Sequence, residues 1–114
     1  MRRVSFYLVQ TGIFVGFATL ALPSCLRAQG DVEKIYKTNC VLCHAADGSG
    51  NSTSGKALRA KDLASSEVQK QSDAELTEVI VKGKGKMPAF EKKLKPDDIK
   101  QLVAYVRALP TKRK

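Results

Sequence analysis

The stretch "NCVLCHAADGSG" at residues 39–50 contains two of the three cysteines of the chain and its single histidine. Cys40, Cys43 and His44 fall within five consecutive positions there. A zinc site, a redox dithiol and a covalent haem attachment all use such a cluster. Each of them requires different partners elsewhere in the sequence, so the rest of the chain discriminates between them.

The start of the chain has the composition of an export signal. Arginines at its beginning precede a predominantly apolar run over residues 4–22, and the first acidic residue is Asp31. Basic, apolar and small polar residues in this order are typical of a secretory signal peptide. We therefore predict a signal peptide over 1–30 and one domain over 31–114, located in the periplasm or an equivalent extracytoplasmic compartment.

Two alternatives for this segment would tether the protein to a membrane. The apolar run is close to the length that spans a bilayer, so an uncleaved segment would act as an anchor. Residues 22–25 ("LPSC") also resemble a lipoprotein acylation site that would place a lipid on Cys25, although proline fits that motif poorly. Cleavage after Gly30 is the prediction that we follow, because small residues occupy Ala28 and Gly30, the positions that signal peptidase reads.

A domain of residues 31–114 is short for a protein that must build its own apolar core. It contains few aromatic residues, and the chain has no tryptophan. A disulfide between Cys40 and Cys43 would close a loop too small to add much stability. A buried cofactor is the better explanation for how such a domain is stabilised.

Three main helices are predicted, with long loops between them. Ser72 and Glu75 give the second a capping-box pattern, and Gly83 should end it. Pro96 is a good start for the third, and Pro110 should end it. The predicted helices, from these signals and from apolar residues at helical spacing, are residues 31–39, 72–82 and 96–109, with a shorter turn at 66–70.

Two loops separate these helices. Residues 47–55 ("DGSGNSTSG") and residues 82–90 ("KGKGKMPAF") are too rich in glycine and polar residues for a regular element. The sequence has no alternating strand pattern and no internal repeat. It therefore predicts an all-α fold, and long loops in so small a domain suggest that they wrap a cofactor.

The chemistry of the Cys-His cluster follows from what accompanies it. A structural zinc site usually takes two separated pairs of ligands, and residues 31–114 have no second pair. A thioredoxin-like dithiol needs a preceding strand, which is also missing. C-x-x-C-H is instead the signature of covalent haem attachment. On helix-like backbone, Cys40 and Cys43 share one face, so their sulfurs can bond the two haem vinyl groups while His44 reaches the iron.

Elimination favours Met87 as the second axial ligand of the iron. The chain has no other histidine, and its only other methionine is Met1. Pro88 disfavours helical backbone at Met87, and nearby glycines let the loop approach a flat ring. Two alternatives are that a lysine binds the iron, or that Met87 is an ordinary loop residue and one iron position is open.

These motifs make the chain similar to the small class I c-type cytochromes, a family of bacterial and photosynthetic monohaem proteins. The similarity is carried by "IYKTNCVLCHAADGSGN" (35–51), "VIVKGKGKMPAF" (79–90) and "DIKQLVAYVRALP" (98–110). It implies a small cytochrome c-type fold in which three main helices and long loops wrap around one haem.

The resemblance also implies roles for particular residues. Cys40 and Cys43 would carry the thioether bonds to one haem c, His44 would be the proximal ligand, and Met87 the distal ligand. With both axial positions filled, the iron has no place for a substrate. The implied function is that of a one-electron carrier between redox partners, and not of an enzyme. The alternative is a haem-based ligand-binding or peroxidatic protein, which requires that Met87 is not a firm ligand.

Two further expectations follow from the resemblance. The first and last helices should cross and bring residues 35–36 near Tyr105. Family members often have a Gly-Pro pair whose carbonyl accepts the other ring proton of the proximal histidine, whereas the corresponding stretch here, residues 55–58, reads "GKAL". A backbone carbonyl can still serve, because proline is not needed to accept a hydrogen bond.

The surface charge suggests the kind of partner. The formal net charge is +9, and several lysines surround Met87 in the sequence. Such a patch would steer redox proteins with acidic docking surfaces, although a solvated lysine surface is the simpler explanation. Because the protein is expected to be exported, nucleic acid is not a predicted partner. We expect a monomer that contacts a membrane only if residues 1–30 are retained or Cys25 is lipidated.

Overall fold

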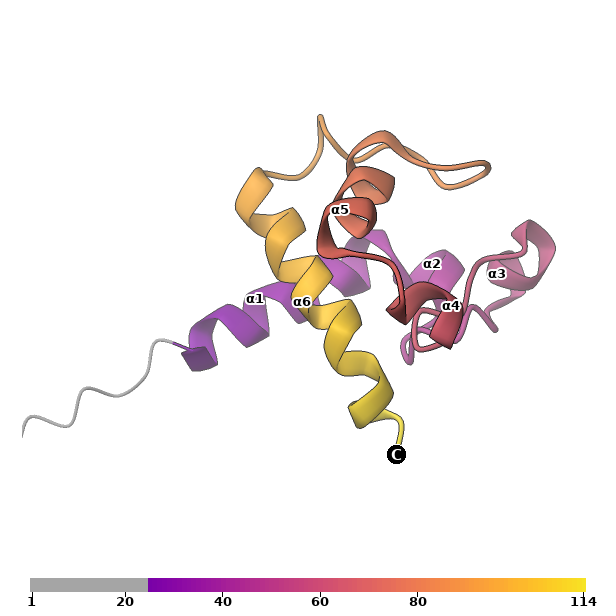
Figure 1. Ribbon diagram of the computed structural model, residues 1–114, viewed down its shortest axis with the longest axis horizontal. Helices are drawn as coiled ribbons and strands as arrows, with labels where there is room; N and C mark the ends of the chain where they lie inside the picture. Colours follow the sequence, from indigo (N-terminus) through magenta and orange to yellow (C-terminus); the bar gives the residue numbers. More distant parts are fainter. Residues whose placement is uncertain (1–24) are drawn as a thin grey trace, which may run out of the picture.

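The computed structural model describes residues 25–114, so most of the predicted signal peptide lies outside it (Figure 1). Within that range no strand forms, and the all-α prediction is confirmed. No helix in residues 25–114 is long and apolar enough to cross a membrane. The helices are α1 (Cys25–Asn39), α2 (Val41–His44), α3 (Thr53–Leu58), α4 (Ser66–Gln69), α5 (Asp73–Lys82) and α6 (Pro96–Lys112).

Helix α1 contains the first predicted helix, and α5 matches the second except that Ser72 is its N-cap. Helix α1 includes residues 25–30, upstream of the predicted start at Asp31, because Gly30 weakens a helix without ending it. Helix α5 has the predicted capping box: Glu75 N donates to Ser72 Oγ over 3.2 Å, and Ser72 N donates to Glu75 Oε2 over 2.6 Å. The residue that follows α5 is Gly83, as predicted.

Helix α6 begins at Pro96 as predicted, but it does not end at Pro110. It continues to Lys112, with Pro110 inside it. Proline lacks the N–H that would bond to the carbonyl of Val106, four residues earlier. That carbonyl instead accepts a hydrogen bond of 3.0 Å from the Gln69 side-chain amide. A side chain from a distant part of the sequence therefore satisfies the group that proline leaves unpaired.

The prediction that residues 47–55 form no regular element is wrong at its end. Helix α3 begins at Thr53 inside that stretch, and Ser52 is its N-cap, with Ser52 Oγ accepting from Gly55 N over 2.9 Å. The short helix expected at 66–70 is confirmed as α4. The sequence underestimates α3 because glycine and serine are poor helix formers inside a helix but good ones at its start.

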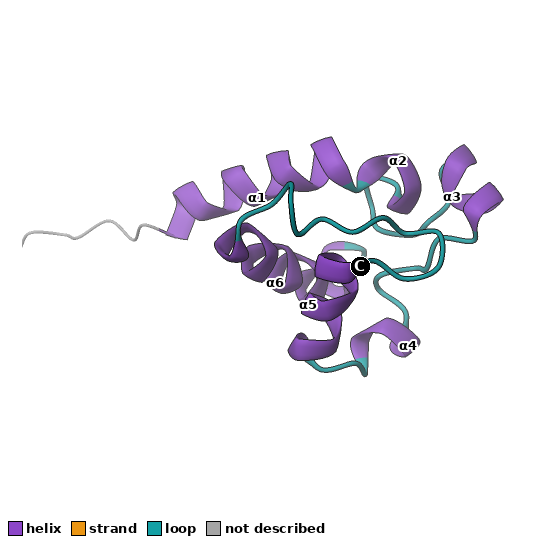
Figure 2. Ribbon diagram, turned by 90° about the horizontal axis from the view of Figure 1, so that it is seen from above, coloured by secondary structure: helices purple, strands orange, loops and turns teal. Residues whose placement is uncertain are grey.

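The core forms where α6 packs between α1 and α5 (Figures 1 and 2). Tyr36 of α1 is only 1% exposed, and its ring lies 4.8 Å from that of Tyr105 on α6. The implied crossing of the first and last helices is therefore confirmed. The buried apolar residues of α6 recur at helical spacing, as an amphipathic helix requires: Ile99, Leu102, Val103, Val106 and Leu109.

A long loop joins α5 to α6 and carries Met87. We call residues 83–95 the Met87 loop. Its tip extends over the side of the molecule on which α2 and α3 lie, as both views show (Figures 1 and 2). The two sequence regions expected to hold an iron ligand therefore lie on the same side of the core.

Candidate functional site

The Cys-His cluster lies on a short helix that follows α1 almost without a break. Cys40 N donates to Tyr36 O over 2.8 Å, and His44 N donates to Cys40 O over 2.8 Å. Both thiols are half-buried, and no disulfide joins them in the described part of the chain. Burial raises the pKa of the Cys40 thiol to about 11, so this group is protonated at neutral pH. The expected helix-like backbone is confirmed.

The imidazole of His44 has one nitrogen fixed by the backbone. Its Nδ1 lies 3.1 Å from Lys61 O. Because a carbonyl oxygen only accepts, Nδ1 carries the proton and Nε2 keeps its lone pair. Burial lowers the pKa of His44 and keeps the ring neutral, although the hydrogen bond to Lys61 opposes that shift. A neutral imidazole with a free Nε2 is suited to bind a metal.

The carbonyl of Lys61 is an acceptor that the sequence did not identify. The residues that correspond to the Gly-Pro pair of the family, 55–58, belong to α3. The acceptor for His44 comes from the turn after that helix. Sequence could not locate it, because any backbone carbonyl can accept and only the path of the chain decides which one is near.

The turn after His44 is strained. Ala45 has φ 62° and ψ 166°, a region that glycine alone occupies readily. The Tyr36 hydroxyl donates to Ala45 O over 2.8 Å, and Gly50 N donates to His44 O over 2.9 Å. These bonds hold a backbone conformation that would otherwise relax.

Ser52 joins α2 to α3. Its Oγ lies 2.6 Å from Leu42 O and 3.1 Å from Cys43 O, where its hydroxyl donates to carbonyls at the end of α2. The same oxygen accepts from Gly55 N at the start of α3. A Cβ on Gly55 would lie only 2.1 Å from Cys43 O, so α3 can approach α2 this closely only with glycine there.

Met87 is held by a tight turn. Lys84 N donates to Met87 O over 3.2 Å, and Met87 N donates to Lys84 O over 3.0 Å. Gly83 and Gly85 both have positive φ, at +74° and +59°. A Cβ on Gly83 would come within 2.5 Å of Met87 O, whereas a Cβ on Gly85 would meet nothing within 4 Å. Only the first glycine is therefore required by close packing.

One cavity of about 470 Å³ is lined by Cys40, Cys43, His44 and Met87 together. An imidazole nitrogen and a thioether sulfur are axial ligands of haem iron, and two cysteines can bond its vinyl groups. An apolar wall suits the macrocycle, so the residues present fit a haem. Apolar side chains make up much of that wall: Leu63, Val68, Leu76, Val79, Ile80, Phe90, Leu94, Leu102, Val103 and Val106.

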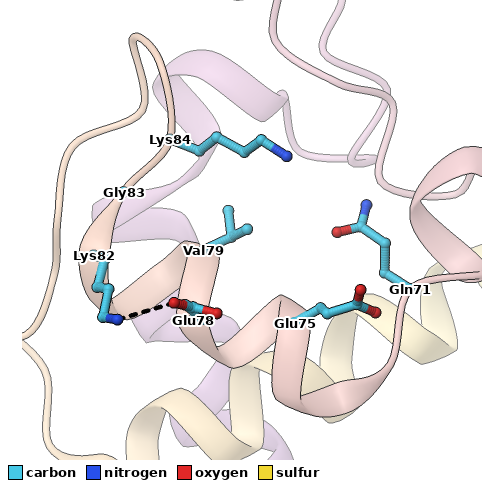
Figure 3. Close-up of a pocket in the computed structure, with 7 residues that line it drawn as sticks. All are labelled: Gln71, Glu75, Glu78, Val79, Lys82, Gly83 and Lys84. Atoms are coloured by element: carbon cyan, nitrogen blue, oxygen red, sulfur yellow. Dashed lines mark hydrogen bonds and ion pairs between the residues drawn. The ribbon is translucent and has the colours of Figure 1, made fainter.

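A smaller polar cavity of about 270 Å³ adjoins the first, and Gln71, Val79 and Lys84 line both. In Figure 3 the side chains of Gln71 and Lys84 point toward one another across it. Its glutamates already have partners: Glu78 pairs with Lys82 over 2.9 Å, and Glu75 belongs to the capping box of α5. Lys84 makes no ion pair with any side chain in residues 31–114.

Two large apolar side chains, Leu42 and Leu58, are exposed although they line the larger cavity. Leu42 is 74% exposed and Leu58 is 40% exposed. We call them the rim leucines. Exposed apolar residues beside a cavity often mark a contact surface. Their exposure could not be read from the sequence, because a leucine is more often a buried residue.

Comparison with known proteins identifies the family. A family model described as cytochrome c oxidase, cbb3-type, subunit III matches residues 27–106. The chain belongs to the cytochrome c family. The match includes both the cysteine cluster and Met87.

Individual relatives of this cytochrome agree with that assignment. Cytochrome c6 of Gloeothece citriformis is 30% identical over 109 residues, which cover 93% of each chain. The cbb3-type oxidase subunit FixP of Bradyrhizobium diazoefficiens is 42% identical over 79 residues, or 68% of this chain and 26% of FixP. Among solved structures, KustC0563 c-type cytochrome has a TM-score of 0.60 and 39% identity over 68% of this chain and 94% of its own.

Membership of the family settles the cofactor and the general activity. The protein is a c-type cytochrome with covalently bound haem c, and it carries electrons. The predicted cofactor, fold class and function are thereby confirmed. Which residues hold the haem, and where and with which partners the cytochrome works, are separate questions.

Proposed function

We propose that this cytochrome is a monomeric one-electron carrier that holds one haem c through Cys40 and Cys43, with His44 and Met87 as its axial ligands. The observation that carries the proposal is the single cavity lined by all four side chains. Three of them come from α2 and its N-cap residue Cys40, and the fourth comes from the Met87 loop. No other methionine is available in residues 25–114.

The residues around the cavity suit electron transfer rather than catalysis. When bound, the haem supplies a reversible one-electron couple. His44 presents its Nε2 lone pair because Nδ1 is tied to Lys61 O. The apolar walls exclude water, which lowers the cost of rearranging the surroundings when the charge changes. Filled axial positions leave no place for a substrate, so we propose that the protein is not an enzyme.

The polar cavity offers a place for the two carboxylates of the haem. Gln71 and Lys84 line both cavities and point toward one another (Figure 3). An ammonium group and an amide are suitable donors to carboxylate oxygens. We therefore assign Gln71 and Lys84 to the haem carboxylates, with Glu75 and Glu78 already engaged elsewhere.

The surface near the cavity indicates how partners dock. The rim leucines expose apolar area beside the cysteine cluster, and Lys61, Lys84 and Lys86 line the same cavity. Apolar contact at the centre with lysines around it suits redox proteins that carry acidic surfaces. We propose that the protein works outside the cytoplasm, with the periplasm as the compartment and residues 1–30 as the export signal. Nucleic acid is not a proposed partner.

The test is an optical spectrum of the haem-loaded protein, taken before and after extraction with acidified organic solvent. Thioether bonds keep the haem with the protein, and a weak far-red band in the oxidised form reports a methionine–iron bond. Haem that extracts would refute the roles of Cys40 and Cys43. Retained haem without that band, or ready binding of carbon monoxide by the unaltered protein, would refute Met87 as a firm ligand and favour a ligand-binding protein.

A further inference from the structure

The turn between α3 and α4 supplies the Lys61 carbonyl that accepts from His44. Contacts with several other elements hold this turn in place. Leu63 N donates to Gly48 O over 2.8 Å, which ties the turn to the loop after α2. The Lys61 ammonium pairs with Glu67 of α4 over 2.7 Å. These contacts hold Lys61 and Leu63, the residues on either side of Asp62.

Asp62 connects this turn to the far end of the chain. One of its oxygens, Oδ1, accepts from Ala64 N over 2.9 Å and also from Nη1 of Arg113. Arg113 is the residue that follows α6, and its own N–H donates to Leu109 O over 3.1 Å. Leu109 is 2% exposed, so this end of α6 is fixed in the core. Arg113 therefore reaches Asp62 from the end of a helix that is anchored in the core.

We propose that Arg113 is a positioning residue for the haem: through its ion pair with Asp62 it holds the Lys61 carbonyl against Nδ1 of His44. This inference rests on the proposed role of His44 as an iron ligand. The side chains of Arg113 and Asp62 are 31% and 39% exposed, so the pair is screened less than one on an open surface. The C-terminal end of the chain would thus act on the iron through one carbonyl.

The expected effect on the reduction potential has a diagnostic sign. A hydrogen bond from Nδ1 to a carbonyl makes the imidazole a better electron donor to a metal, which favours the oxidised iron. Weakening that bond therefore raises the potential. Removing a cation near the haem acts in the opposite direction, because a nearby positive charge favours the reduced form with its lower charge. Loss of positioning and loss of charge can thus be told apart.

The experiment compares Arg113→Gln with Lys114→Gln in the haem-loaded protein. Both variants remove one positive charge from the same end of the chain, and Lys114 makes no ion pair with any side chain in residues 31–114. We expect the potential to rise in Arg113→Gln and to stay or fall in Lys114→Gln. In the reduced protein, exchange of the His44 Nδ1 proton with solvent should become up to about fivefold faster in Arg113→Gln alone, as expected for the loss of a partly exposed ion pair.

Asp62→Asn is the second variant to compare. The asparagine amide oxygen can still accept from Ala64 N, while the negative charge at position 62 is lost. In combination with Arg113→Gln it should add no further change to the proton exchange rate. A potential that falls equally in Arg113→Gln and Lys114→Gln, with unchanged exchange, would overturn this inference while the spectrum still shows both axial ligands. If that spectrum is absent from the unaltered protein, the proposed function itself fails.

Discussion

The two sides of the haem cavity are built in contrasting ways. On the side of His44, which we call the proximal side, the ligand belongs to a helix, and side chains or carbonyls from three other segments bond to it or to its neighbours: Tyr36, Ser52 and Lys61. On the side of Met87, the distal side, the ligand belongs to a loop closed by two backbone hydrogen bonds with Lys84.

The two sides therefore differ in the interactions that order them. The proximal side is fixed by the protein itself, well enough to keep Ala45 in a strained conformation. The Met87 loop is rich in glycine and lysine, with few apolar side chains to bury. A bond between iron and sulfur would therefore be a major support of that loop. Changes on the distal side should alter ligation first, and changes on the proximal side should mainly alter stability.

The largest effect is expected for Met87→Ala, which removes the distal ligand and leaves the proximal side intact. The far-red band should vanish, and the reduced protein should bind carbon monoxide. The potential should fall by on the order of 0.1 V, a fraction of the roughly 0.8 V that axial ligands control. Optical spectra and redox titration measure both changes. Lys86→Ala is the matched control and should keep the band; a band that survives in Met87→Ala would assign the distal position to another residue.

Gly83→Ala should have the next largest effect, because it disturbs the packing that supports the Met87 loop. A Cβ there would lie 2.5 Å from Met87 O and 2.9 Å from Ala89 N, in a backbone conformation with φ +74°. We expect a loss of about 3 kcal/mol in unfolding free energy, with a weaker far-red band. Gly85→Ala is the matched control: it has positive φ but open space, so it should cost only about 1 kcal/mol. Equal losses in chemical denaturation would show that packing against Met87 is irrelevant.

Ser52→Ala tests the proximal side. The side chain caps α3 and donates at the end of α2, so its loss should cost about 1–2 kcal/mol without changing the axial ligands. Ser65→Ala removes a cap of the same type from α4, where the hydroxyl accepts from Val68 N over 3.4 Å. Denaturation of both variants should show a larger loss for Ser52→Ala. A change in the far-red band with Ser52→Ala would contradict the independence of the two sides.

How far sequence predicts this molecule depends on whether a feature is local. The capping box at Ser72 and the amphipathic pattern of α6 are local, and both were predictable. The continuation of α6 past Pro110 was not, because it depends on Gln69 reaching the free carbonyl from another helix. The residues proposed to bind the iron could be chosen by elimination, since histidine and methionine are scarce in this chain. The Lys61 carbonyl could not be chosen in this way, because every residue has a backbone carbonyl.

The smallest expected effect is a gain in stability from Ala45→Gly. The φ and ψ values of Ala45 cost a residue with a Cβ about 1–3 kcal/mol, whereas glycine adopts them freely. The greater freedom of glycine in the unfolded chain offsets part of the gain, so we expect a net increase of about 1 kcal/mol. Arg59→Gly is the control, since φ 56° and ψ 46° are the ordinary left-handed values, and its gain should be smaller. If Ala45→Gly instead lowers the denaturation midpoint, the backbone of Ala45 is not strained in the folded protein. The order of the proximal side then does not depend on the hydrogen bonds around this turn.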